Sequence, residues 1–192
     1  MKAREYEQEL KQIICTNEWF MAVLKAVRDC EPPDWFVGAG VIRNLVWDHL
    51  HEYTHPTLIR DVDVAFFDPH DLGPEREAAL QAQLSNRLPN IPWEATNQAA
   101  VHSWYEKVFG YAVPALTSSK EAISTWPETA TSIGVRLLPD GDLLVEAPFG
   151  LEDLFQMVLR RNPRRVSIEQ FRRRVIERKL EEIWPKVRVM DG

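Results

Sequence analysis

The sequence predicts one α+β domain, α/β-like in its first half: a mixed sheet flanked by helices, with helical N- and C-terminal elements. Short apolar strands alternate with helical periodicity between residues 35 and 96, and a hairpin signal follows at Pro139-Asp140-Gly141-Asp142. At 192 residues the chain can bury a sizeable core without disulfides. We assign residues 1–192 to a single domain, with its core at about 35–150 and C-terminal helices at about 151–185.

The first half of the chain divides into segments at prolines and glycines. Apolar residues recur with a 3.6-residue period over 4–29, which predicts one amphipathic helix that Pro32-Pro33 ends. Alternation of Val62, Val64 and Phe66 with more polar residues predicts a strand. The expected elements of this half are helices at 4–29, 41–50 and 74–88 and strands at 35–37, 60–67 and 93–96.

The second half is less regular. Ser118 or Ser119 is expected to cap a short helix over 120–126. The Pro-Asp-Gly-Asp turn predicts a hairpin of strands 133–138 and 143–147. The remaining segments, 151–159 and 168–183, are expected to be helices separated by Asn162-Pro163.

Composition excludes several classes of protein. The longest apolar run, Trp19 to Leu24, is too short to cross a bilayer, and the N-terminal segment lacks the pattern of a signal peptide. Two cysteines provide no disulfide framework and no four-cysteine zinc site. We therefore expect a cytoplasmic protein with no membrane partner.

The charge is unevenly distributed along the chain. The net charge of −6 argues against a protein that coats nucleic acid, and no DNA partner is expected. From Arg160 onward, however, there are eleven Lys or Arg and five Asp or Glu. This basic segment either docks a polyanion or is neutralised by the acidic body and solvent. The second interpretation is favoured.

Two features point to phosphate and metal chemistry. Asp61 and Asp63 lie two residues apart on a predicted strand, so their carboxylates share a face and suit Mg²⁺ together with substrate phosphates. The alternative is a solvated face of acidic residues. Gly38-Ala39-Gly40 joins a strand to a helix, where backbone N–H groups can hold an anion, although a tight turn alone also needs glycine.

These motifs resemble the core of the polymerase-beta-like nucleotidyltransferase superfamily, in which a glycine turn and a helix precede an acidic-x-acidic strand. Longer stretches resemble an uncharacterised bacterial nucleotidyltransferase-like family known as a domain of unknown function. The stretches are Gly38-Ala39-Gly40-Val41-Ile42-Arg43-Asn44, Trp93-Glu94-Ala95-Thr96-Asn97-Gln98-Ala99, His102, and Ala147-Pro148-Phe149-Gly150-Leu151-Glu152-Asp153.

The resemblance implies a nucleotidyltransferase-type fold and assigns roles to residues. Asp61 and Asp63 would bind the metal, Mg²⁺ or alternatively Mn²⁺, and Glu94 would be the third catalytic carboxylate and a further metal ligand. Gly38, Ala39 and Gly40 would form the phosphate turn. Many members carry a hydroxyl in this turn and this chain does not, so grip on the triphosphate would fall to backbone N–H groups and Arg43.

Polar residues after the third strand are further candidates. Asn97, Gln98 and His102 could hydrogen-bond a base or sugar. Equally, Asn97 could cap the next helix with His102 packed on it. For Arg43, a structural salt bridge is as well supported as phosphate binding.

The sequence thus predicts a metal-dependent nucleotidyltransferase that moves an NMP from an NTP substrate to an unknown acceptor. A small-molecule or protein acceptor is favoured over RNA. The alternative is a catalytically inactive nucleotide-binding or interaction module on the same fold, related to toxin–antitoxin systems.

Overall fold

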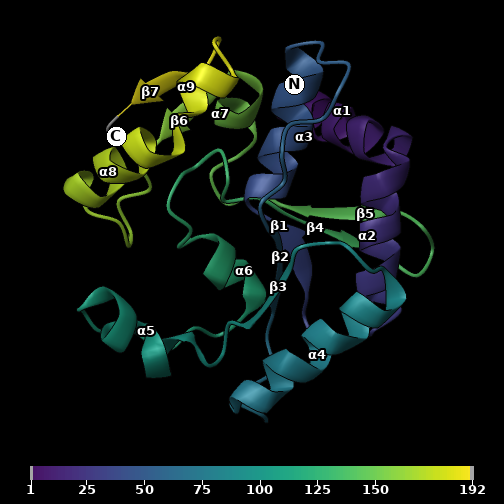
Figure 1. Cartoon of the computed structure of the whole chain (residues 1–192), viewed down its shortest axis with the longest axis vertical. Helices are drawn as coiled ribbons and strands as arrows, with labels where there is room; N and C mark the ends of the chain where they lie inside the picture. The colour runs from purple at the N-terminus through teal and green to yellow at the C-terminus, as the bar shows by residue number, and fades with distance from the viewer. Residues whose placement is uncertain (1, 191–192) are drawn as a thin grey trace.

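A mixed five-stranded sheet organises the protein, as the computed structural model of the chain shows for residues 2–190 (Figure 1). Its order is β3-β2-β1-β4-β5. Strands β2 and β3 are parallel and the other neighbours are antiparallel, which confirms the α+β fold class. The strands are β1 (Phe36–Gly38), β2 (Val62–Phe66), β3 (Trp93–Asn97), β4 (Gly134–Leu137) and β5 (Leu143–Glu146).

Helices cover the sheet on both sides. In Figure 1, α2 and α4 lie on one side of the strands, and α5, α6 and α8 lie on the other. No helix within residues 2–190 is long and apolar enough to cross a membrane. The helices are α1 (Lys2–Thr16), α2 (Glu18–Arg28), α3 (Gly40–Leu50), α4 (Pro74–Arg87), α5 (Val101–Phe109), α6 (Ser119–Ile123), α7 (Glu152–Phe155), α8 (Ile168–Arg178) and α9 (Leu180–Ile183).

The N-terminal segment folds as two helices, so the prediction of one helix over 4–29 is wrong at its centre. Asn17 has extended backbone angles, and its side-chain oxygen accepts a hydrogen bond of 2.8 Å from the N–H of Phe20. Asn17 is therefore the N-cap of α2. The break lets Leu10 and Ile14 of α1 and Phe20 and Leu24 of α2 all reach the buried core.

The C-terminal part departs further from the prediction. The helix expected over 151–159 ends at Phe155, because Met157 takes a left-handed φ of 53° and the chain continues as strand β6 (Val158–Arg160). This strand pairs in parallel with β7 (Arg188–Met190), so the C-terminal part is not purely helical. The helix expected over 168–183 is likewise interrupted at Lys179, where φ is 50°.

Candidate active site

The predicted acidic residues meet at one face of the sheet. In the parallel pairing of β2 and β3, Asp63 lies directly beside Glu94, so the two side chains share a face. Asp61 is two residues before Asp63, immediately ahead of β2. All three line one cavity of about 250 Å³ together with Ala39 and Gly40. The fold thus brings a metal-binding type of donor set to the glycine turn.

The electrostatics of this carboxylate cavity follow from burial and crowding. The pKa of Asp63 is raised to about 7, because burial and the charges of Asp61 and Glu94 together outweigh the opposing effect of Arg178 and Arg174. Within residues 2–190, no three His, Cys, Asp or Glu side chains are already arranged to hold a metal ion. Mg²⁺ needs only one or two carboxylates when substrate phosphates supply the other ligands. Asp61 and Asp63 fit that requirement.

The turn before α3 presents backbone donors to the cavity. Ala39 has a φ of 59° and a ψ of −126°, and its side chain provides no cap for the helix. The first N–H groups of α3 therefore lack a side-chain partner, and they lie at the positive end of the helix dipole. A methyl group at Gly40 would lie 3.7 Å from Asp61 Oδ1 and 3.9 Å from Arg43 Nη2, in ordinary contact.

Gly38 has a different reason to be glycine. It does not line the carboxylate cavity, and a methyl group there would collide with the carbonyl oxygen of Ile133 and lie 2.7 Å from the Trp126 ring. The close packing around β1 leaves no room for a side chain at this position. The structure thus places Ala39 and Gly40 at the cavity and Gly38 behind it.

Arg43 is a buried cation beside Asp61. Its Nε and Nη2 atoms donate to Asn44 Oδ1 at 3.2 and 2.7 Å, and its guanidinium stacks on Trp47 and Trp184. Its Nη1 atom is buried with no hydrogen-bond partner. Burial lowers its pKa to about 10, so the side chain stays charged at neutral pH. Arg43, Gly40 and Asp61 line a second cavity of about 420 Å³.

Helix α8 brings two arginines that the sequence analysis assigned to no site. Arg174 and Arg178 line the carboxylate cavity from the other side. Arg174 Nε lies 3.1 Å from Oε1 of the buried Glu128, whose Oε2 accepts from Thr131 Oγ1 at 3.0 Å. Their (i, i+4) spacing places both arginines on one helix face, but the sequence does not show which part of the fold that face meets.

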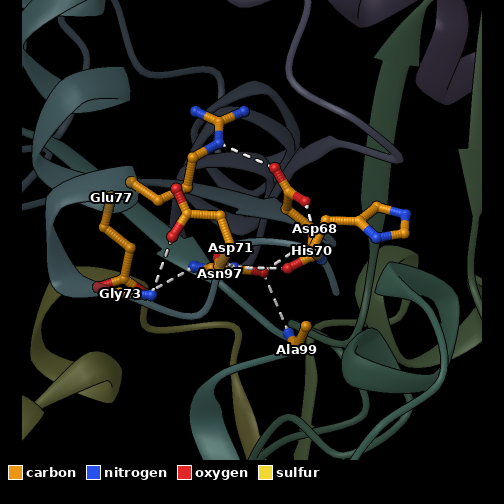
Figure 2. A network of polar contacts seen from close by, with 8 residues as sticks. Asp68, His70, Asp71, Gly73, Glu77, Asn97 and Ala99 are labelled. Carbon is orange, nitrogen blue, oxygen red and sulfur yellow. Dashed lines mark hydrogen bonds and ion pairs between the residues drawn. The ribbon is translucent and has the colours of Figure 1, made fainter.

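Asn97 does not line the carboxylate cavity, and its side chain lies instead in the polar network drawn in Figure 2. Its side-chain oxygen accepts from the N–H groups of Asp68 and Ala99, and its amide nitrogen donates to the carbonyls of Asp68 and Asp71. Three of these bonds hold the loop after β2, and the bond from Ala99 ties that loop to the chain after β3. Asn97 does not cap a helix either, because α5 begins after Ala100. Gln98, by contrast, lines the carboxylate cavity.

Comparison with solved structures gives a match over nearly the whole chain. A domain solved by NMR and described as a CCA-adding enzyme head domain is 28% identical, with a TM-score of 0.81 and 96% of each chain covered. The Thermotoga maritima CCA-adding enzyme in complex with tRNA is 13% identical with a TM-score of 0.51, and a CCA-adding enzyme in an apo form is 14% identical with a TM-score of 0.50. The chain spans 38% and 42% of these two enzymes, which share its fold.

Comparison by sequence identifies the family. No curated protein matches the chain significantly. A family model described as nucleotidyltransferase matches residues 25–189, which include the glycine turn, the three carboxylates and the arginines of α8. The chain therefore belongs to this nucleotidyltransferase family.

Proposed function

We propose that the protein is a divalent-metal-dependent nucleotidyltransferase that uses Asp61, Asp63 and Glu94. The observation that carries this proposal is the register of β2 and β3, which sets Glu94 beside Asp63 in a cavity shared with Asp61. The N-terminal turn of α3 opens into the same cavity. Carboxylates for a metal and free N–H groups for phosphates thus lie within one site.

The triphosphate of an NTP binds at the start of α3. Backbone N–H groups of the first helical turn donate to its oxygens, and the helix dipole adds to the attraction. Arg43 supplies the unpartnered Nη1 donor and a charge that burial leaves poorly solvated. Arg178 lines both this region and the carboxylate cavity, so it adds a second positive charge near the triphosphate.

Asp61 and Asp63 would hold Mg²⁺ or Mn²⁺, which supplies charge neutralisation at the phosphates when bound. Glu94 is more exposed than Asp63 and also lines the neighbouring cavity of about 450 Å³. It accepts the proton of the acceptor hydroxyl. The acceptor oxygen forms a bond to the α-phosphorus, the bond to the bridging oxygen breaks, and pyrophosphate leaves with that electron pair.

Turnover is tested with the purified protein, each labelled NTP, Mg²⁺ or Mn²⁺ and a small-molecule extract of cells, with pyrophosphate release and label transfer as readouts. Asp61→Asn and Asp63→Asn are expected to abolish both signals, and Glu94→Gln is expected to lose transfer while keeping NTP binding. Asp140→Asn, in the hairpin turn, and Glu9→Gln, on the exposed face of α1, are matched controls expected to retain activity. Equal activity in Asp61→Asn and Asp140→Asn would refute the proposal.

One observation favours a second candidate, a nucleotide-binding module without turnover. Ala39 carries no hydroxyl, so the turn offers only backbone donors to phosphate. The two candidates differ in one measurement. A module binds NTP with an affinity that Arg43→Gln weakens, yet it releases no pyrophosphate with any acceptor.

A further inference from the structure

A larger cavity adjoins the carboxylates on the side of Glu94. Its volume is about 450 Å³, within the size range of small-molecule sites. Its lining shares Glu94, Gln98 and Trp126 with the carboxylate cavity. The cavity lined by Arg43 shares Gly40 and Asp61 with the carboxylate cavity instead. The carboxylates therefore separate two different environments. We call the one beside Glu94 the aromatic cavity.

Aromatic side chains form one wall of this cavity. The ring of Tyr105 lies 4.4 Å from that of Phe109 and 5.4 Å from that of Tyr111, measured between centroids. The hydroxyls of Tyr105 and Tyr111 are 3.1 Å apart, and Tyr111 donates to the carbonyl of Arg165 at 2.6 Å. Trp104 and Trp126 also line the cavity. Such a surface favours a planar ring that can stack on it.

Arg165 adds a positive charge to this wall. Its guanidinium carbon lies 5.0 Å from the centroid of the Tyr105 ring. Among residues 2–190, no hydrogen bond or ion pair engages this guanidinium. Arg174 differs, because it is paired with Glu128. Arg165 is therefore available to an anionic group on a ligand, whereas Arg173, which also lines the cavity, lies 4.0 Å from Glu177 on the exposed face of α8.

We propose that the aromatic cavity binds the acceptor, and that the acceptor is a small molecule with a planar ring, an anionic group and a hydroxyl. The ring stacks on the aromatic wall, the anion pairs with Arg165, and the hydroxyl reaches Glu94. This assignment rests on the proposed nucleotidyl transfer. A polycationic acceptor fits poorly, because arginines outnumber acids around the cavity. An RNA fits less well than a small molecule. The cavity of about 450 Å³ has the size of a small-molecule site, and the net charge of −6 on the chain disfavours a polyanion.

Two naphthalene probes test the cavity directly. The first, 8-anilinonaphthalene-1-sulfonate, has aromatic rings and an anion, and the second, N-phenyl-1-naphthylamine, has the same rings without the charge. Arg165→Gln is expected to weaken binding of the sulfonate about tenfold and to leave the neutral probe unchanged. Trp104→Ala and Phe109→Ala are expected to weaken both about tenfold. Phe109 is half exposed, so its removal spares the fold.

Matched variants and NTP binding complete the test. Arg4→Gln and Ile176→Ala remove an exposed cation and an exposed apolar side chain outside the cavity, and they are expected to change neither probe. Arg165→Gln is also expected to leave NTP affinity unchanged. An unaltered sulfonate affinity in Arg165→Gln and Phe109→Ala would overturn the inference. Displacement of the sulfonate by a short single-stranded RNA, or loss of NTP binding in Arg165→Gln, would also overturn it.

The inference and the proposed function fail in distinguishable ways. If the probe pattern is lost while pyrophosphate release remains sensitive to Asp61→Asn, only the assignment of the aromatic cavity is wrong. If the probe pattern holds while no NTP yields pyrophosphate or transferred label, nucleotidyl transfer fails, and the acceptor role fails with it.

Discussion

Arg174 Nε lies 3.1 Å from Glu128 Oε1, and this ion pair joins helix α8 to the segment between α6 and β4. Glu128 is 2% exposed, and Thr131 hydrogen-bonds its other oxygen. Arg43 and Arg178 add to the positive charge around it. One buried carboxylate thus balances the arginines beside the carboxylate cavity and holds α8 to the segment before β4.

Glu128→Gln should destabilise the fold. It leaves the surrounding arginines without their buried counter-charge, which typically costs about 3 kcal/mol or more. Urea denaturation at neutral pH measures the free energy of unfolding, and Glu9→Gln on the exposed face of α1 is the matched control. A stability loss no larger than that of Glu9→Gln would contradict the role assigned to Glu128.

The same residue predicts a pH dependence. Burial alone would raise the pKa of Glu128, but Arg174, Arg178 and Arg43 outweigh it and hold the pKa below the usual range of a glutamate. An acid with a lowered pKa in the folded state contributes stability that is fully present above its unfolded pKa of about 4.3. That contribution is lost as pH falls through the folded value. Stability measured from pH 7 downward should therefore fall less steeply in Glu128→Gln than in the wild type.

Ala39→Gly should stabilise the protein. Its φ of 59° with a ψ of −126° is a conformation that glycine adopts without strain and alanine does not, at a cost of about 1–3 kcal/mol. Part of the gain is offset by the greater freedom of glycine in the unfolded chain, so a net increase of about 1 kcal/mol is expected. Ala79→Gly, at an exposed position inside α4, should lose about 1 kcal/mol in the same denaturation assay.

Substitutions at the two glycines of the turn should differ in their effect on stability. Gly38→Ala forces a methyl group into Trp126 and the Ile133 carbonyl, so it should lower stability by about 1–3 kcal/mol. Gly40→Ala fits without a clash and should preserve the fold. The bulkier Gly40→Val should weaken NTP binding, because its side chain crowds the helix N-terminus. Denaturation and NTP titration on the same preparations separate the effects. Full NTP affinity in a folded Gly40→Val protein would refute phosphate binding at this turn.

Neighbouring residues at the end of β3 should also separate stability from binding. Asn97→Ala removes three hydrogen bonds that hold the loop after β2 and a fourth from Ala99, so it should cost about 3 kcal/mol while the remaining folded protein keeps its NTP affinity. Gln98→Ala removes one long contact of 3.4 Å to the Thr96 carbonyl and should change stability little. Because Gln98 lines the carboxylate cavity, its loss should lower the rate of nucleotidyl transfer.

Local patterns predicted the parts of the fold that local physics decides. The alternation around Val62 and Val64 and the turn at Gly141 predicted β2 and the β4–β5 hairpin correctly. The break at Asn17 was missed because the apolar period continues across it. Strand β6 was missed because its partner, β7, lies beyond α8, and short apolar runs do not distinguish strand from helix.

Some residues of the candidate site could be predicted from local sequence, and others depend on tertiary packing. The motif spacing brought Asp61 and Asp63 together in prediction, and the sheet register places Glu94 beside them. Arg174 and Arg178 depend on how α8 packs, and no local signal fixes that packing. Asn97 was grouped with Gln98 on sequence position. Side chains alternate between the two faces along β3, and Gln98, directly after the strand, lines the cavity with Glu94 and Thr96, whereas Asn97 does not.

Trp126 forms part of the wall between the carboxylate cavity and the aromatic cavity, and Trp184 lies against Arg43 at the phosphate end. The molecule therefore carries its own optical reporters at both ends of the proposed reaction path. Indole emission depends on nearby charge and solvent, so sequential addition of nucleotide and acceptor should give two separable fluorescence changes. Trp126→Phe would remove the fluorescence of the tryptophan that lines both cavities. The order in which the two substrates bind could then be followed without any label.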